Sequence, residues 1–176
     1  MSQLHTTKAI ILRTVKYGET SLVVSAYTEL FGIQSYLVNG VRTSSKKGAG
    51  KANLFQPGSI LELIVYHNEL KNLQRIKEFK WSYLYQHVLS DVIKNSIVLF
   101  MVELIQKCIK QPETNADLFN FIEESLIQVD KSNLEQLLLN YEIRRSLLNN
   151  LQLFYALHIQ EFGQLKSLLV LQEVLS

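Results

Sequence analysis

Residues 8–38 read KAIILRTVKYGETSLVVSAYTELFGIQSYLV, and this stretch decides the fold. Three runs rich in β-branched and apolar residues, at 8–15, 21–28 and 33–38, are separated by the turn-forming stretches YGET and LFG. This pattern predicts three β-strands joined by tight turns.

The next stretch, NGVRTSSKKGAGK at 39–51, holds four cations, three glycines and no acid. A structural hairpin turn needs about two to five residues and gains nothing from unopposed positive charge. We therefore expect a loop that meets a polyanion. The alternative is a solvated turn.

Two further strands are expected after this loop. FQPGS at 55–59 marks a turn, and ILELIVYH at 60–67 resumes the strand pattern. In the segment 71–79 and just before it, the apolar residues Leu70, Leu73, Ile76 and Phe79 recur every third position, which by itself favours a helix. We predict a strand there, because a fifth strand closes the sheet. Five strands in about eighty residues predict a Greek-key barrel of the OB-fold type.

From Trp81 onward the periodicity is helical. An apolar stripe from Leu84 to Cys108 predicts a first helix, which Pro112 ends. The patterns TNAD at 114–117 and SNLE at 132–135 match capping boxes and predict helices over 118–129 and 134–150. LQLFYALHI at 151–159 and a last helix at 164–175 follow. The expected fold is thus an α+β multidomain chain, a five-stranded OB-fold barrel followed by an all-α domain.

Charge supports this division. Residues 1–80 carry eleven Lys or Arg and five Asp or Glu, a net charge of +6, whereas residues 81–176 have a net charge of −4. We expect a basic, nucleic-acid-binding domain at 1–80 and an acidic, partner-binding helical domain at 81–176. No apolar stretch is long enough to cross a membrane, and the start of the chain lacks a signal-peptide pattern, so a cytoplasmic protein is expected.

The basic loop and the cations on neighbouring strands or turns are the expected DNA-binding residues, because mobile point charges can follow a phosphate backbone. They are Arg42, Lys46, Lys47 and Lys51 in the loop, and Lys8, Arg13, Lys16, Lys71, Arg75 and Lys77 around it. Four aromatic residues could stack on bases, although at least half should be core: Tyr17, Tyr36, Phe55 and Tyr66.

Catalytic and metal chemistry have no recognisable constellation in the sequence. The four histidines, at 5, 67, 87 and 158, are scattered, and the single Cys108 excludes a multi-cysteine zinc site. We expect Cys108 to be a core thiol, and we expect neither a cofactor nor an enzyme. An adaptor whose barrel binds a protein or an oligosaccharide remains an alternative, since OB-folds do both.

The order of several short motifs resembles the amino-terminal domain of the RecO family of DNA repair proteins. These are the strand Lys8 to Thr14, the turn Tyr17 to Glu19, the step Thr28 to Gly32 and the entry Gly40 to Arg42 into the basic loop. The resemblance covers about the first eighty residues. It implies an OB-fold and a recombination mediator that binds single- and double-stranded DNA, anneals complementary strands, and acts with the single-stranded-DNA-binding protein SSB and with RecR, sometimes RecF, to load RecA.

The resemblance also implies a site for the acidic, hydrophobic tail of SSB. We expect it in the helical half, with Arg144, Arg145, Lys107 or Lys110 as its cations. Many relatives carry a four-cysteine zinc module there, which this chain cannot form. Very little chain lies between LQLFYALHI and FGQLKSLLVLQEVLS, so a segment near Ile159–Phe162 is expected to be missing or disordered.

Overall fold

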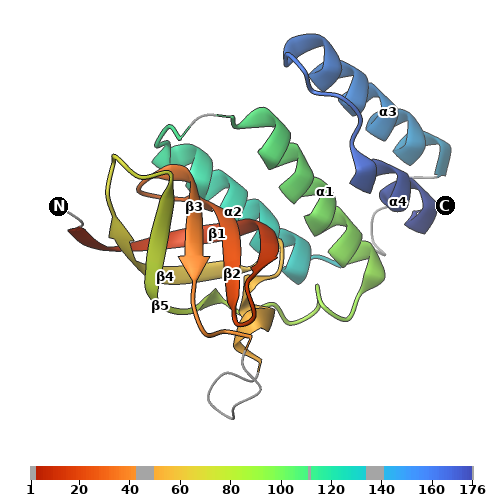
Figure 1. The fold of residues 1–176 in the computed structure, drawn as a ribbon. Coiled ribbons are helices and arrows are strands. Elements are labelled where there is room, and N and C mark those ends of the chain that lie inside the picture. Colours follow the sequence, from red (N-terminus) through yellow and green to blue (C-terminus); the bar gives the residue numbers. More distant parts are fainter. Residues whose placement is uncertain (1–2, 43–49, 111, 134–140, 176) are drawn as a thin grey trace. The chain divides into compact units, whose positions relative to one another are not determined.

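The computed structural model describes residues 3–42, 50–110, 112–133 and 141–175 (Figure 1). Within these ranges, the elements are β1 (Gln3–Tyr17), β2 (Ser21–Thr28), β3 (Gly32–Val38), the short 3₁₀ helix η1 (Lys51–Phe55), β4 (Ile60–His67), β5 (Leu73–Tyr83), α1 (Val92–Cys108), α2 (Ala116–Lys131), α3 (Tyr141–His158) and α4 (Lys166–Val174).

The five strands of the described residues form a closed barrel in the order β1-β2-β3-β5-β4. The long strand β1 closes it, pairing with β4 over Gln3–Ile10 and with β2 over Ala9–Tyr17. A bulge between Ile11 and Arg13 accompanies the change of partner. Strand β3 pairs with β5 in parallel over Ser35–Leu37. This strand order and the helices that follow confirm the expected fold class.

A bulge in β5 explains why the apolar residues of this strand show a helical spacing. Leu70 lies in the preceding turn and is 94% exposed. The register of β4 and β5 shifts between Val65, which faces Ile76, and Ile64, which faces Glu78. The extra residue on β5 makes inward positions fall at Ile76 and Phe79, three apart rather than two. The strand prediction is confirmed, and the threefold spacing is the signature of a bulge.

The interior of the barrel is closed by large side chains. Tyr36 is fully buried, and Phe55 of η1 is 1% exposed and packs edge-on against Phe79 at 4.7 Å. The Thr14 hydroxyl donates to the carbonyl of Phe55 over 2.6 Å. The segment that follows the basic loop is therefore anchored in the core. The inward residues of the strands complete this cluster: Ala9, Ile11, Leu22, Val24, Ala26, Val38, Leu61, Leu63 and Val65.

The turn from Thr28 to Gly32, between β2 and β3, requires a glycine at position 32. The Thr28 hydroxyl accepts from the Phe31 N–H and donates to the Gly32 carbonyl, which closes the turn between β2 and β3. Gly32 has φ +60°, and a Cβ there would lie 2.4 Å from the carbonyl oxygen of Glu113. Only glycine fits this position without displacing backbone.

Helix α2 begins differently from the capping-box prediction. The Asn115 side chain, not that of Thr114, accepts from the N–H of Leu118, so Asn115 is the N-cap. The first half of α2 packs on the barrel, where Phe119 lies 5.7 Å from the ring of Tyr27. The remaining half belongs to the second unit described below.

Contacts divide the chain into two compact units: the barrel unit, residues 1–84 with 110–124, and the helical unit, residues 85–109 with 125–176. The expected boundary at residue 80 falls inside β5. The roles assigned to the ranges 1–80 and 81–176 stay predictions.

The first helix begins later than its apolar stripe suggested. Strand β5 continues to Tyr83, and Trp81 packs against the barrel core. Helix α1 starts at Val92, because the Asp91 carboxylate accepts from the N–H groups of Ile93 and Lys94 as its N-cap. It ends at Cys108, four residues before Pro112.

Two buried or half-buried carboxylates organise the helical unit. Asp130, 1% exposed, accepts from the backbone N–H groups of residues 86, 87 and 88 at 2.8–3.0 Å. Glu103 of α1 caps the start of α4, accepting from the N–H groups of Lys166 and Ser167 and from the Ser167 hydroxyl. Phe100, Phe162, Leu165, Leu168 and Leu171 form the apolar centre.

The carboxy-terminal predictions have mixed outcomes. The second capping box runs into residues 134–140, which lie outside the described residues, and the described helix α3 spans Tyr141–His158. The last helix is confirmed as α4. Residues 159–163 are described and form a turn in which Phe162 is buried and stacks on Tyr155 at 5.4 Å. Cys108 packs half-buried against the apolar centre, and burial raises the pKa of its thiol.

Candidate nucleic-acid interface

The outward face of β1, β2, β3 and β5 is the candidate interface. One aligned row of residues across these strands points inward or is buried: Thr14, Val24, Tyr36 and Gln74. The neighbours of these residues along each strand therefore point outward. In register across the four strands, one outward row joins Arg13, Ser25, Ser35 and Leu73. The next row joins Val15, Val23, Leu37 and Arg75.

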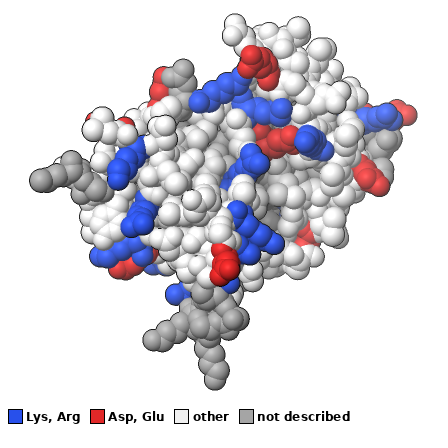
Figure 2. All heavy atoms as spheres, in the orientation of Figure 1, with Lys and Arg blue, Asp and Glu red and all other residues white. Residues whose placement is uncertain are grey.

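These two rows place an arginine at each side of an uncharged centre. Arg13 on β1 and Arg75 on β5 are both exposed, and about 14 Å separates the outer strands at a spacing of about 4.8 Å per strand. Figure 2 views the barrel from this side, with Lys and Arg gathered over β5 and white surface over β2 and β3. Such a face offers cations for phosphates at its edges and uncharged side chains for bases between them.

Arg42 ties the start of the basic loop to the turn between β1 and β2. Its Nη1 donates to the Gly18 carbonyl over 3.0 Å, and its backbone N–H donates to the Thr20 carbonyl over 3.0 Å. Gly18 and Gly40 have φ of +57° and +68°, which favour glycine. The turn at Tyr17 to Glu19 and the step Gly40 to Arg42, quoted above as separate motifs, therefore form one structure.

The basic loop itself is described only at its ends. Arg42 stands at its start, and Lys51 is exposed at the first position of η1. Lys46 and Lys47 lie outside the described residues. Lys16 is exposed near the end of β1, at the same turn that holds Arg42.

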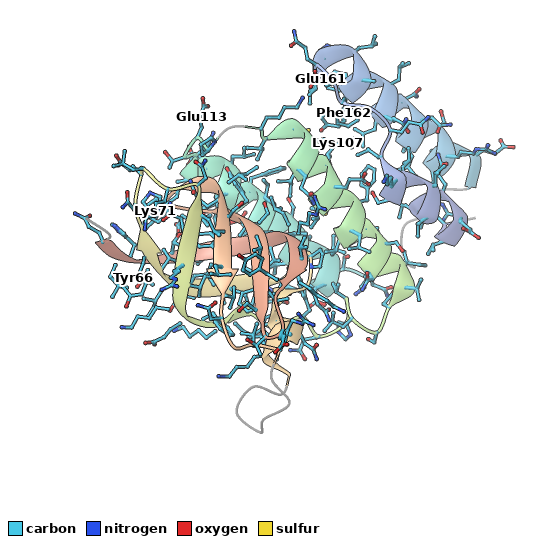
Figure 3. All side chains as sticks on the ribbon, in the orientation of Figure 1. Tyr66, Lys71, Lys107, Glu113, Glu161 and Phe162 are labelled. Carbon is cyan, nitrogen blue, oxygen red and sulfur yellow. The ribbon has the colours of Figure 1, made fainter. Side chains whose placement is uncertain are left out.

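The hairpin between β4 and β5 brings the second group of expected cations together. Gln74, 3% exposed, accepts from the Asn68 N–H and donates to the carbonyls of Asn68 and Lys71, which fixes the hairpin. Lys71, labelled in Figure 3, is exposed on this hairpin, and Arg75 and Lys77 follow on β5. Lys77 lies 3.7 Å from Glu78, and both are exposed.

Lys8 does not join this face. Its Nζ donates to the buried Glu123 carboxylate over 2.8 Å. This hydrogen bond raises the pKa of Lys8, because it stabilises the charged form. The Lys8 charge is therefore balanced within the barrel unit.

The aromatic candidates divide as expected between core and surface. Tyr36 and Phe55 are buried, and burial raises the pKa of the Tyr36 hydroxyl. Tyr17 is 57% exposed and Tyr66 is 40% exposed. Tyr66 lies opposite Arg75 in the register of β4 and β5 and is labelled in Figure 3. These two rings are the ones available for stacking among the four.

The expected partner-binding cations do not form one cluster. Arg144 of α3 donates from Nη2 to the Leu175 carbonyl over 2.8 Å, and its Nε is buried without a partner among the described residues. Arg145 beside it is exposed. Lys107 of α1 donates to the Phe162 carbonyl over 2.6 Å, and both residues are labelled in Figure 3. Lys110 falls in the barrel unit.

Sequence reasoning missed a hollow at the end of this face. His5, Phe31 and His67 are far apart in the chain, yet the structure stacks Phe31 on His67 at 3.9 Å and sets His5 edge-on to Phe31 at 5.2 Å. No local motif signals this group, because each residue comes from a different strand or turn. Within the described ranges, no three His, Cys, Asp or Glu side chains are placed to hold a metal ion.

None of the helices in the described parts of the chain is long and apolar enough to span a membrane.

Comparison with known proteins identifies the family. The family described as "Recombination protein O N terminal" matches residues 1–85, and "Recombination protein O C terminal" matches residues 89–151. A protein named DNA repair protein RecO from Christiangramia forsetii is 36% identical over 127 residues, which are 72% of this chain and 53% of that protein. One from Flavobacterium psychrophilum is 39% identical over 124 residues, 70% of this chain and 52% of that protein.

The chain spans about half the length of these curated relatives. Its barrel, its helices and both family matches agree with the resemblance seen in its motifs. The chain belongs to the RecO family of recombination proteins.

Proposed function

We propose that this chain acts in DNA repair as a recombination mediator that binds single- and double-stranded DNA and anneals complementary strands. The observation that carries the proposal is the outward face of β1, β2, β3 and β5, where exposed Arg13 and Arg75 flank uncharged rows. The relatives named DNA repair protein RecO support it. The protein acts by binding, in the cytoplasm with the nucleoid, and no covalent chemistry is assigned to it.

The mechanism follows from charge. Two DNA strands repel each other through their phosphates, and cations at the edges of the face lower this repulsion while bases over the centre stay free to pair. Each phosphate contact releases condensed counterions, so the affinity for single strands falls with salt by a log–log slope of about −0.7 per contact. Annealing by this route requires no nucleotide hydrolysis.

The first test is fluorescence anisotropy with a labelled oligo-dT over a series of salt concentrations. For the double variant Arg13→Ala/Arg75→Ala, the log–log slope of affinity against salt should be smaller in magnitude by about 1.4, which corresponds to two lost phosphate contacts. The control Lys80→Ala/Lys166→Ala removes the same charge from positions outside the two rows, since Lys80 pairs with Glu62 at 2.8 Å and Lys166 is the first residue of α4. Equal slopes in all three proteins would overturn the proposal.

Weak binding that does not respond to salt would instead favour the alternative, an OB-fold adaptor for a protein or oligosaccharide. The remaining proposed partners are SSB, RecR and possibly RecF, with RecA loading as the outcome. For the acidic SSB tail, Arg145 is the best cation, because its side chain is exposed, whereas that of Arg144 is half-buried. Arg145→Glu should weaken binding of an SSB tail peptide, and unchanged affinity would remove this assignment.

A further inference from the structure

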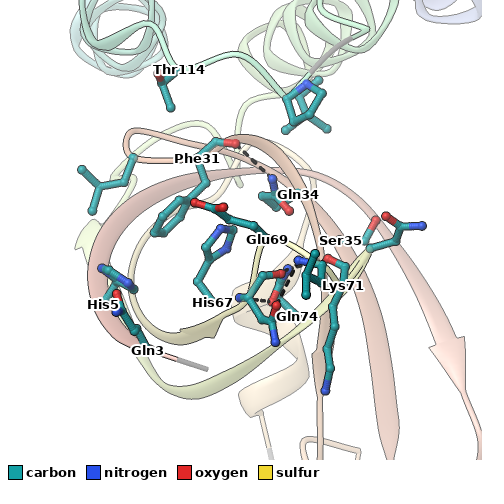
Figure 4. A pocket seen from close by; sticks show the side chains of 16 residues that line it. Gln3, His5, Phe31, Gln34, Ser35, His67, Glu69, Lys71, Gln74 and Thr114 are labelled. Carbon is teal, nitrogen blue, oxygen red and sulfur yellow. Dashed lines mark hydrogen bonds between the residues drawn. The ribbon is translucent and has the colours of Figure 1, made fainter. Parts of the chain in front are cut away.

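A hollow of about 1020 Å³ opens at the end of the barrel that carries the β4–β5 hairpin (Figure 4). Its walls come from the start of β3, the hairpin at 68–72, the first residues of β1 and the segment 112–114. Small-molecule sites occupy about 300–1,000 Å³, so this hollow is large enough for a flat ring with its attached sugar.

Stacked rings form one wall of the hollow. Phe31 and His67 lie nearly parallel, at 3.9 Å and 12°, and His5 stands at 5.2 Å and 6.2 Å from them, edge-on to both. Burial and the nearby His5 lower the pKa of His67, against the opposing charge of Glu69, which favours the neutral ring. A neutral aromatic wall suits stacking with a further planar ring.

Polar groups surround these rings in fixed positions. Gln34 donates to the Phe31 carbonyl over 3.1 Å, and Gln74 holds the hairpin through its bonds to Asn68 and Lys71. The His67 Nδ1 is buried and has no hydrogen-bond partner in the described part of the chain. An unpaired buried nitrogen is costly, and the edge of a nucleobase offers both donors and acceptors that could pair with it.

The hollow continues the candidate interface. Ser35 belongs to the outward row of Arg13 and also lines the hollow, and Gln74 precedes Arg75. The exposed Lys71 stands on the hairpin at the rim, as Figure 4 shows. A strand whose phosphates contact Arg75 and Lys71 would therefore bring a base beside the Phe31–His67 wall.

We propose that this hollow receives an unstacked base of single-stranded DNA lying along the interface. The inference rests on the proposed function and adds to it, because it assigns recognition of a base, independent of the phosphates, to a particular site. Holding one base out of the stack would also fix the position of the strand on the barrel.

The experiment compares oligo-dT with an oligonucleotide of the same length made of abasic residues, which keeps the phosphates and lacks the bases. Both are measured by anisotropy against the full chain. The parent should prefer oligo-dT by at least about fivefold, the low end of one base–ring stack. Phe31→Leu removes the ring and keeps an apolar side chain, and it should shrink the preference while leaving the salt slope unchanged.

Ser35→Leu is the second variant, because it narrows the hollow from a half-exposed position, adds no ring that could stack on a base, and deletes no packed ring. It should shrink the preference in the same way, whereas Arg13→Ala/Arg75→Ala should lower the salt slope and keep the preference. If both hollow variants retain the parent's preference, or the parent shows none while its binding still depends on salt, the inference fails and the proposed function stands. Loss of salt-dependent binding to both oligonucleotides in the parent would overturn both.

Discussion

The guanidinium of Arg42 donates a hydrogen bond to the carbonyl of Gly18, 24 residues earlier in the chain, over 3.0 Å. This bond ties the start of the basic loop to the turn between β1 and β2. Arg42 therefore has a structural role as well as a charge at the rim of the interface.

Replacing Arg42 separates these two roles. Arg42→Ala should lower the free energy of unfolding by about 1 kcal/mol, the net contribution of one hydrogen bond, in urea denaturation. Arg13→Ala, at an exposed position, should stay within about 0.5 kcal/mol of the parent. If Arg42→Ala is as stable as Arg13→Ala, the bond does not hold the loop.

Gly32 and Gly18 provide a matched pair, since their φ angles are +60° and +57°. A Cβ at Gly32 would meet the Glu113 carbonyl at 2.4 Å, whereas nothing lies within 4 Å of a Cβ at Gly18. Gly18→Ala should cost about 1 kcal/mol of backbone strain, and Gly32→Ala at least about 2 kcal/mol more, because backbone must move. Equal losses in urea denaturation would show that the close approach contributes nothing.

Asp130 should be the most sensitive carboxylate of the helical unit. Asp130→Ala leaves three N–H groups without their acceptor and should cost about 3 kcal/mol. Asp130→Asn keeps one acceptor oxygen and should cost less. The exposed Glu124 on the same helix is the control, and Glu124→Ala should change the stability by under about 0.5 kcal/mol.

Glu103 should make the helical unit sensitive to acid. Burial acts to raise its pKa, but hydrogen bonds from Ser167 and Lys166 outweigh burial and hold the pKa of Glu103 below its usual value. A lowered pKa adds stability above the unfolded value of about 4.3, and this is lost as the pH falls through the folded pKa. Between pH 5 and pH 3 the parent should lose more stability than Glu103→Gln, by circular dichroism; parallel profiles would contradict this.

The sequence predicted the strands and missed what the strands bring together. Alternation and turns located the barrel, because each strand is a local pattern. The predicted start of α1 was wrong, because the apolar pattern begins before the helix and Asp91 caps the helix within that pattern. Lys8 looked like the other cations, and its pairing with Glu123, 115 residues away, is visible only in the folded chain. The proximity of His5 and His67, which are far apart in the sequence, is likewise visible only in the folded chain.

The short parallel pairing of β3 with β5, over Ser35–Leu37, has one more consequence. Because these parallel strands pair over so few residues, we expect the barrel wall to open locally between β3 and β5. The candidate interface crosses this line, with Ser35 and Leu37 on one side and Leu73 and Arg75 on the other. A ligand that contacts both β3 and β5 would hold the two strands together. Amide hydrogen exchange in both strands should therefore slow when the ligand is present.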